Sequence, residues 1–101
     1  MIVFNVTMKV ENGIHDAWLQ WQEEKHIPDT MACGLFTGYT FFRLLEQDET
    51  DGATYVLQYF AKDYDDYKKY IDNFHLQLQQ KEFTTWKHHI ISFHTVMKNV
   101  H

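Results

Sequence analysis

The chain has 101 residues, of which 45% are hydrophobic and 17% aromatic, and its formal net charge is −5 at pH 7. This size and composition predict one globular domain over residues 1–101. The acidic balance argues against a nucleic-acid partner, which needs clustered basic residues, and Arg43 is the only arginine. The lone cysteine, Cys33, excludes an internal disulfide, and no apolar run approaches the ~18 residues of a membrane span. We therefore expect a cytoplasmic protein without nucleic-acid or membrane partners.

The first half of the chain predicts a strand, a helix and a second strand. Residues 1–10 ("MIVFNVTMKV") alternate with a period of two, which is typical of a strand. Apolar side chains over residues 14–21 follow helical spacing. Pro28 lacks a backbone N–H and disfavours a helical residue before it, so we expect this helix to end or kink near His26. Residues 35–46 then predict the second strand.

The second half predicts a hairpin, a helix and a last strand. The polar turn "DETDG" at 48–52 precedes the third strand, "ATYVLQYFA", at 53–61. Asp63 stands where a helix N-cap belongs, and the spacing of the apolar residues predicts a helix over about 64–80. The segment "HHIISFHTVM" at 88–97 predicts the fourth strand. The order β-α-β-β-α-β is that of the ferredoxin-like plait, an α+β fold with a four-stranded antiparallel sheet.

Both parity classes of the predicted strands contain many apolar side chains. The set expected to face the helices is Phe4, Val6, Met8, Phe42, Leu44, Tyr55, Leu57, Tyr59, Ile91 and Phe93. The set expected on the opposite face is Val3, Asn5, Thr7, Tyr39, Phe41, Arg43, Val56, Gln58, Phe60, Ile90, His94 and Val96. A sheet face in water should be polar, and a large exposed apolar patch usually marks an interface. We therefore predict a homodimer in which a second copy covers this face.

Several long strings of the sequence resemble one bacterial family of proteins of about this length, for which no reaction is established. The strings are "MIVFNVTMKV", "EEKHIPDTMACGLFTGY", "RLLEQDE", "TYVLQYF" and "DYKKYID", in order along the chain. The resemblance includes the His-Ile-Pro run that begins at His26. It implies membership of the dimeric α+β barrel group, in which two ferredoxin-like subunits pack sheet to sheet. It implies no catalytic residue.

More distant barrel relatives include antibiotic-biosynthesis-type monooxygenases and haem-degrading enzymes. The haem-degrading pattern has an Asn on the first strand, which Asn5 matches, and a Trp and a His on the second helix. Here the second helix carries Tyr67 and Tyr70 instead of Trp, and the spacing from them to His75 does not match. This departure argues against haem, and we predict no cofactor.

His26 allows two interpretations. At a helix C-terminus an imidazole can cap free carbonyls and interact favourably with the helix dipole. Alternatively, His26 is a general acid or base at the mouth of a cleft between helices and sheet, because imidazole titrates near neutral pH. In that case aromatic side chains of the two helices, with Trp21 and Tyr67 as candidates, line the cleft and bind the ligand.

A second candidate cluster consists of polar residues that are expected to share one sheet face: Asn5, Arg43, Gln58 and His94. In a functional interpretation Arg43 binds a carboxylate or enolate, His94 is the base, and the two amides donate hydrogen bonds. In a structural interpretation the four form a polar network across the dimer, since buried polar groups need partners.

The seven histidines do not predict a metal site. The adjacent His88 and His89 would point to opposite faces of a strand, and no His-x-x-x-His motif occurs. The sequence therefore favours a small-molecule-binding protein or a cofactor-independent enzyme with a site in the helix–sheet cleft. The alternative is a non-catalytic homodimeric interaction or regulatory module.

Overall fold

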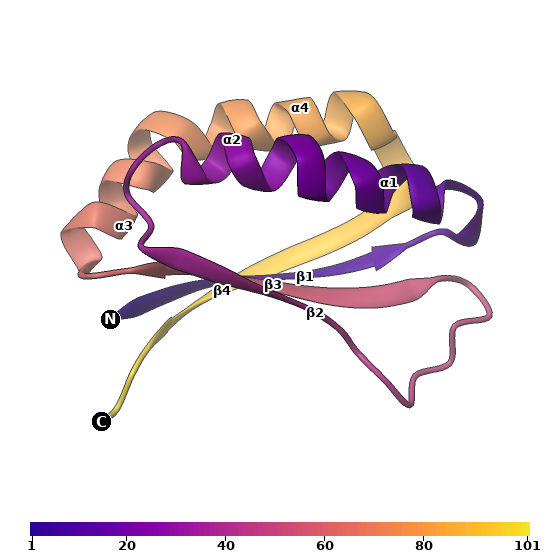
Figure 1. Cartoon of the computed structure of the whole chain (residues 1–101), viewed down its shortest axis with the longest axis horizontal. Helices are drawn as coiled ribbons and strands as arrows, with labels where there is room; N and C mark the ends of the chain where they lie inside the picture. Colours follow the sequence, from indigo (N-terminus) through magenta and orange to yellow (C-terminus); the bar gives the residue numbers. More distant parts are fainter.

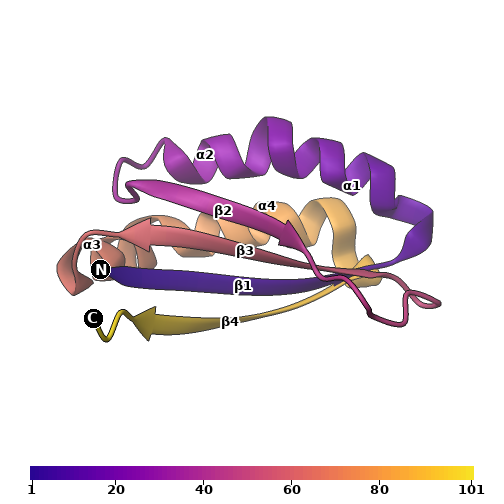
Figure 2. The same cartoon turned by 60° about the horizontal axis from the view of Figure 1, so that its bottom comes forward.

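The computed structural model describes residues 1–101 and has a four-stranded sheet in the order β2-β3-β1-β4. The strands are β1 (Ile2–Val10), β2 (Gly38–Arg43), β3 (Ala53–Ala61) and β4 (Ile90–Lys98). All neighbouring strands are antiparallel, and Figure 2 shows their order across the sheet. The helices all cover the same face of the sheet (Figure 1). The predicted ferredoxin-like plait is confirmed.

The first helical segment continues through the position where we expected it to end. It consists of η1 (Asn12–Ile14), α1 (His15–Trp21), the π-helical turn η2 (Gln22–His26) and α2 (Ile27–Met31). In the π turn the N–H of Ile27 donates to the carbonyl of Gln22, five residues back. The hydroxyl of Thr30 donates to the carbonyl of His26 at 2.9 Å. The chain therefore passes Pro28 without leaving the helix, so the expected end at His26 is wrong. The other expectation was a kink, and a π turn does interrupt the regular α-helix at this position.

The second helical segment is also longer than predicted. It consists of α3 (Tyr64–Tyr70), the π-helical turn η3 (Ile71–His75), α4 (Leu76–Trp86) and the 3₁₀ turn η4 (Lys87–His89). Residues 81–86, expected as a connection, are helical because they contain no glycine or proline to stop the helix. Lys87, with φ of 53°, ends the α-helix α4. No helix of the protein is long and apolar enough to cross a membrane.

The start of α3 is fixed by the N-cap that the sequence predicts. The Asp63 carboxylate accepts a hydrogen bond of 2.9 Å from the backbone N–H of Asp66. Replacing Asp63 with alanine is expected to lower the free energy of unfolding by about 1 kcal/mol. Asp63→Asn, which keeps the acceptor, is the matched control, and chemical denaturation measures both. Equal losses in the two variants would show that charge, and not capping, is what matters there.

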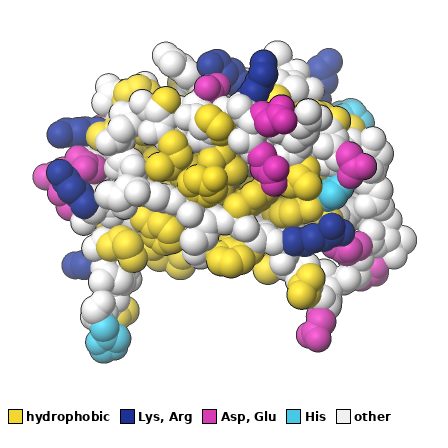
Figure 3. Space-filling model, in the orientation of Figure 1, with side chains coloured by type: hydrophobic (Ala, Val, Ile, Leu, Met, Phe, Trp, Pro, Cys, Tyr) yellow, Lys and Arg dark blue, Asp and Glu magenta, His cyan; other side chains and the backbone are white.

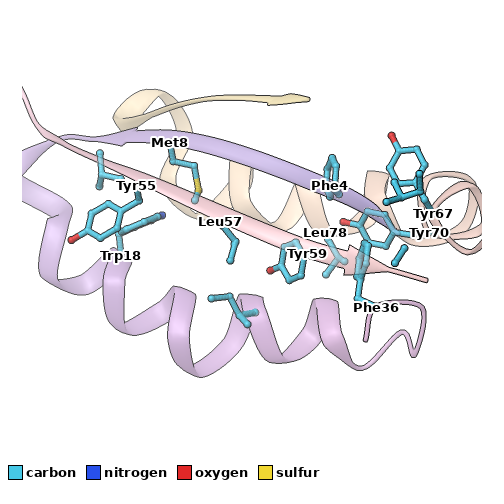
Figure 4. Close-up of a cluster of buried hydrophobic side chains, with 14 of the residues drawn as sticks. Phe4, Met8, Trp18, Phe36, Tyr55, Leu57, Tyr59, Tyr67, Tyr70 and Leu78 are labelled. Atoms are coloured by element: carbon cyan, nitrogen blue, oxygen red, sulfur yellow. The ribbon is translucent and has the colours of Figure 1, made fainter. Parts of the chain in front are cut away.

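The hydrophobic core lies between the sheet and the helices (Figure 4). Its strand members come from alternate positions of the two central strands, β1 and β3, as predicted. They are Ile2, Phe4, Met8 and Val10 from β1, and Ala53, Tyr55, Leu57, Tyr59 and Ala61 from β3. Trp18 from α1, Ile27 from α2 and Phe36 from the connection to β2 complete it together with Tyr67, Tyr70 and Leu78.

The two edge strands have the opposite orientation to the one that we predicted. In β2, Phe41 pairs with Leu57 and therefore faces the helices, so Phe42 faces outward and is 54% exposed. In β4, His94 pairs with Val6 on the helix side, which leaves Phe93 on the outer face. Arg43, Tyr39, Ile90 and Val96 change sides for the same reason, and Ile91 moves to the outer face. Leu44 lies beyond the end of β2.

The outer face of the sheet carries one polar row between two apolar rows. The polar row is Thr40, Gln58, Asn5 and Thr95, and the apolar rows contain Phe60, Val3 and Met97 on one side and Phe42, Val56 and Phe93 on the other. No helix covers this face (Figure 1). The loop between β2 and β3 and the C-terminal tail extend beyond it, and both project at the bottom of Figure 3.

Candidate functional site

A pocket lies between the two helical segments and the sheet strands β1, β3 and β4. Its cavity volume is about 50 Å³, and the pocket is partly open to solvent. Its lining residues are Phe4, Val6, Met8, Gln22, His26, Thr30, Leu57, Tyr59, Tyr70, His75, Leu78, Gln79, Glu82, Ser92 and His94. The sheet contributes mainly apolar side chains, whereas the helices contribute most of the polar ones. This is the usual composition of a small-molecule site.

Each helical segment presents a stripe of polar side chains to the pocket. The first stripe is Gln22, His26 and Thr30, and the second is His75, Gln79 and Glu82. On an ideal α-helix residues four apart drift around the axis, because a turn takes 3.6 residues. The wider π turn η2 counters this drift between Gln22 and His26, whereas the second stripe starts at the last residue of η3 and is spaced by four and three residues, which keeps it on one face. Such turns frequently occur at functional sites.

The pocket contains a histidine–carboxyl pair, His26 and Glu82. The Nε2 atom of His26 lies 3.7 Å from Oε2 of Glu82, and the two side chains are only 14% and 17% exposed. Burial lowers the pKa of His26 to about 4. Two charges have smaller effects: Asp29 raises this pKa, and Lys81 lowers it. Burial also raises the pKa of Glu82 to about 7. Between these values a neutral imidazole faces a protonated carboxyl group, so the pair is not an ion pair.

His26 has none of the surroundings of a helix cap. It lies inside a continuous helix, and its ring stacks on Trp21 at a centroid distance of 4.7 Å. Trp21 in turn meets the edge of Trp86. The capping interpretation of His26 is therefore wrong, because there is no helix end at this position. Trp21 contacts the pocket residue His26 but is not itself part of the lining.

Two buried polar atoms of the lining have no hydrogen-bond partner in the protein: Oε1 of Gln22 and the hydroxyl of Tyr59. The side chain of Gln22 is fully buried, and its amide nitrogen approaches the sulfur of Met8 at 3.6 Å. Since a thioether can only accept, the oxygen must be the free end of the amide. The Thr30 hydroxyl lies near Tyr59 but donates elsewhere, and no hydrogen bond of good geometry joins them.

Two other histidines, His75 and His94, lie together at the end of the pocket nearest α3. The rings of His75 and His94 meet edge-on with centroids 5.3 Å apart, and both contact the ring of Phe4. The Tyr70 hydroxyl lies 3.3 Å from Nδ1 of His75. Burial, together with the neighbouring His94, lowers the pKa of His75. His94 belongs to the exposed edge strand and lies at the rim of the pocket.

The polar cluster predicted on one sheet face is divided between three places. Asn5 and Gln58 do share the outer face, where the amide of Gln58 donates to Asn5 at 3.1 Å and accepts from Thr40. His94 is in the pocket, on the other side of the sheet. Arg43 lies at the exposed end of β2, where its guanidinium forms two hydrogen bonds with Glu49. The predicted joint site of these four residues is therefore wrong.

Tyr67, the remaining predicted ligand-binding residue, is buried against Phe4 and lies outside the pocket lining. Two further pocket residues were not predicted from the sequence: Gln22, which follows the apolar stripe over residues 14–21, and Glu82, which lies beyond the predicted end of the second helix. For Gln22 the only signal in the sequence was its spacing of four from His26, and for Glu82 there was none. No group of three or more His, Cys, Asp or Glu side chains is arranged to hold a metal ion.

A family model matches residues 1–100 of this chain, and its description is "domain of unknown function (DUF4286)". The chain belongs to this family. No curated protein matches it significantly. This DUF4286 protein therefore has a family that fits the resemblance in its sequence but does not supply a reaction.

Solved structures show the same fold at low sequence identity. A protein from Bacillus halodurans described as an "ethyl tert-butyl ether d (ethd) family protein" has a TM-score of 0.70 at 11% identity, over 99% of this chain and 100% of that one. A dimeric ferredoxin-like protein from an uncultured marine organism has 0.68 at 11% identity, over 99% and 95%. SnoaB, a cofactor-independent oxygenase from Streptomyces nogalater, has 0.62 at 13% identity, over 99% and 94%. These similarities establish the fold alone.

Proposed function

We propose that this DUF4286 protein binds a small molecule in the pocket and catalyses a proton transfer there without a cofactor. The observation that carries the proposal is the buried pair of His26 and Glu82, which burial holds in neutral form within a partly open pocket. Acid–base catalysts work best when their pKa is close to the operating pH. A pKa of about 7 fits Glu82 to that role.

Glu82 and His26 would have different tasks. The ionised carboxylate of Glu82 accepts a proton from a weakly acidic C–H or O–H of the ligand, which becomes an anion. The neutral imidazole of His26, 3.7 Å away, then donates a hydrogen bond to a developing negative charge. The proton returns from Glu82 to a different atom of the ligand, so no charge is left behind. In this proposal His26, our predicted acid–base residue, acts as the polarising partner, because its pKa of about 4 is too low for a base at neutral pH.

The fold supports this proposal as an analogy. SnoaB is described as a cofactor-independent oxygenase, and other neighbours are described as antibiotic biosynthesis monooxygenases. A fold shared at such low identity does not transfer a reaction, since function belongs to the site and not to the fold. The polar lining of this chain's own pocket therefore has to carry the argument.

Exchange of the α-protons of hydroxyacetone in D₂O, followed by NMR, tests the proposed proton transfer. We expect the protein to accelerate exchange above buffer, with a rate that rises with pH around a midpoint near 7. Glu82→Gln should reduce the acceleration by about 10²- to 10⁴-fold. Glu23→Gln, on the exposed side of the first helical segment, is the matched control. Acceleration that survives in Glu82→Gln, or none in the wild-type protein, would reject the acid–base role.

We also propose that the outer sheet face binds a second copy of the chain. The two apolar rows there would be buried, and the central polar row of Asn5, Gln58, Thr40 and Thr95 would supply hydrogen bonds near a twofold axis. A structural neighbour described as a dimeric ferredoxin-like protein supports this assembly. If the pocket proves inert, a non-catalytic homodimeric or regulatory module becomes the better account of the protein.

A further inference from the structure

We propose that the pocket selects an uncharged molecule with both a hydrogen-bond donor and an acceptor, such as a carboxamide or a hydroxyketone. The inference rests on the proposed function, because it names the class of ligand for the same pocket. Its basis is the pair of buried atoms without partners, Oε1 of Gln22 and the hydroxyl of Tyr59. A buried polar atom without a hydrogen bond destabilises the protein, and a ligand that pairs with it recovers that loss.

The two unpaired atoms require different groups on the ligand, a hydrogen-bond donor for one and an acceptor for the other. Oε1 of Gln22 can only accept, so the ligand must present an N–H or O–H to it. The hydroxyl of Tyr59 can donate to a ligand oxygen, because no hydrogen bond of good geometry occupies it; the nearby hydroxyl of Thr30, which donates to the carbonyl of His26, is the acceptor that a ligand would have to replace. Figure 4 shows Tyr59 pointing from β3 towards the helix layer, beside Leu57. A hydrocarbon would leave both atoms unpaired.

The charges around the pocket disfavour an ionic ligand. No lysine or arginine belongs to the lining, and burial lowers the pKa of His26 and His75, so a carboxylate or phosphate would lose its hydration without meeting a permanent counter-charge. Glu82 is the only acidic residue of the lining, and burial favours its neutral form. A cationic ligand would therefore have to drive the ionisation of Glu82 before it gained a partner. Asp29 and Lys81 influence His26 with opposite signs and do not give the pocket a net field of one sign.

The rest of the lining fits the apolar part of such a ligand. Phe4, Val6, Met8, Leu57 and Leu78 form an apolar surface across the sheet and the second helical segment. This surface would cover a hydrocarbon skeleton, while the polar stripes orient the functional group. The chemistry required is therefore one uncharged polar group on a compact apolar body.

Four probes with the same skeleton separate these possibilities: benzamide, acetophenone, benzoate and benzamidinium. Benzamide has a donor and an acceptor, acetophenone has only an acceptor, and the other two are an anion and a cation of similar shape. Each is titrated at pH 6.0, where Glu82 is protonated, into the ¹⁵N-labelled full chain, and the backbone amide shifts of pocket residues report binding. We expect benzamide to bind at least about tenfold more tightly than each of the other three, the scale of one satisfied hydrogen bond.

Two variants test the assigned partners. Gln22→Met and Tyr59→Phe should each weaken benzamide binding by about five- to twentyfold. Gln22→Met should leave the affinity for acetophenone unchanged, since acetophenone has nothing to donate. There are two matched controls. Gln20→Met changes an exposed glutamine of the same helical segment, and Tyr67→Phe changes a buried tyrosine outside the pocket. Thermal melts verify folding, and Gln22→Met should not lower stability because it removes an unpaired polar atom.

The outcomes distinguish this inference from the proposed function. Tightest binding by benzoate or benzamidinium, or equal binding of acetophenone and benzamide, would overturn the inference while the pocket still counted as a ligand site. Pocket amides that respond to none of the four probes would reject the proposed function together with the inference. Benzamide affinity that is unchanged in both Gln22→Met and Tyr59→Phe would also overturn the inference.

Discussion

Replacement of Glu82 by glutamine is expected to stabilise the protein, relative to the wild type, more at pH 8 than at pH 5. The pKa of Glu82 is about 7 in the folded protein, against an ordinary value of 4.5, because burial disfavours the carboxylate. The folded state therefore holds this proton more firmly than the unfolded state does. The resulting stability is fully present below pH 4.5 and is lost as the pH rises through about 7. Glutamine has no proton to lose and avoids this loss.

His26 contributes in the opposite direction. Its pKa falls from 6.5 to about 4 on folding, because burial disfavours the imidazolium. Its contribution to stability is therefore present above pH 6.5 and is lost as the pH falls towards 4. In the wild-type protein the two contributions nearly cancel between about pH 4.5 and 6.5. Removing either group should expose the pH dependence of the other.

The measurement is the free energy of unfolding by urea at several pH values for each variant. Relative to the wild type, Glu82→Gln should gain roughly 2–3 kcal/mol between pH 5 and pH 8. His26→Gln should change in the reverse sense, becoming relatively more stable as the pH falls. Glu23→Gln, an exposed helical carboxylate, is the control and should run parallel to the wild type. A Glu82→Gln curve that also runs parallel to the wild type would show that Glu82 is not held protonated.

Replacement of Phe93 by lysine is expected to convert a dimer into a monomer. Phe93 is 61% exposed on the outer face of β4, so a lysine there should leave the fold of the single chain intact. In a sheet-to-sheet dimer the same side chain would be buried at the β4 end of an apolar row. A charge there would lose hydration without gaining a partner. The dissociation constant of the dimer should therefore rise by roughly a hundredfold or more.

Light scattering coupled to size exclusion measures the mass of the particle against the chain mass of 12.2 kDa. The matched control is Phe83→Lys, because Phe83 is 69% exposed but belongs to α4, on the opposite side of the sheet. This control should remain a dimer. A wild-type protein that is monomeric at high micromolar concentration, or a Phe93→Lys variant that stays dimeric, would contradict the proposed interface.

The edge strands show most clearly where sequence reasoning failed. Alternation predicts that neighbouring residues of a strand point to opposite faces, but it does not say which face holds the core. In β1 and β3 the choice was clear, because both strands are central and their inward positions are consistently apolar. In β2 and β4 both parities contain aromatic or branched side chains, such as Phe41 and Phe42. Only the pairing with the neighbouring strand decides between them.

The helices failed for a different reason. Pro28 is a strong local signal for a helix end, but the π turn before it and the hydroxyl of Thr30 satisfy the backbone around it. This solution depends on packing against the sheet and cannot be read from local preferences. Glu82 was missed because it stands in a segment without strong periodicity. Its partner, His26, is 56 positions away in the chain, and no local spacing joins them.

The sequence alone determined the order of the elements, the N-cap at Asp63 and the orientation of the central strands. Each of these depends on local alternation, spacing or capping, which a single segment contains in full. The tertiary structure alone decided which side chains meet. It placed His94 in the pocket and away from Asn5, paired His26 with Glu82, and left Gln22 and Tyr59 without partners. Burial creates the pKa values and the unpaired atoms of this site, and burial exists only once distant segments have packed together.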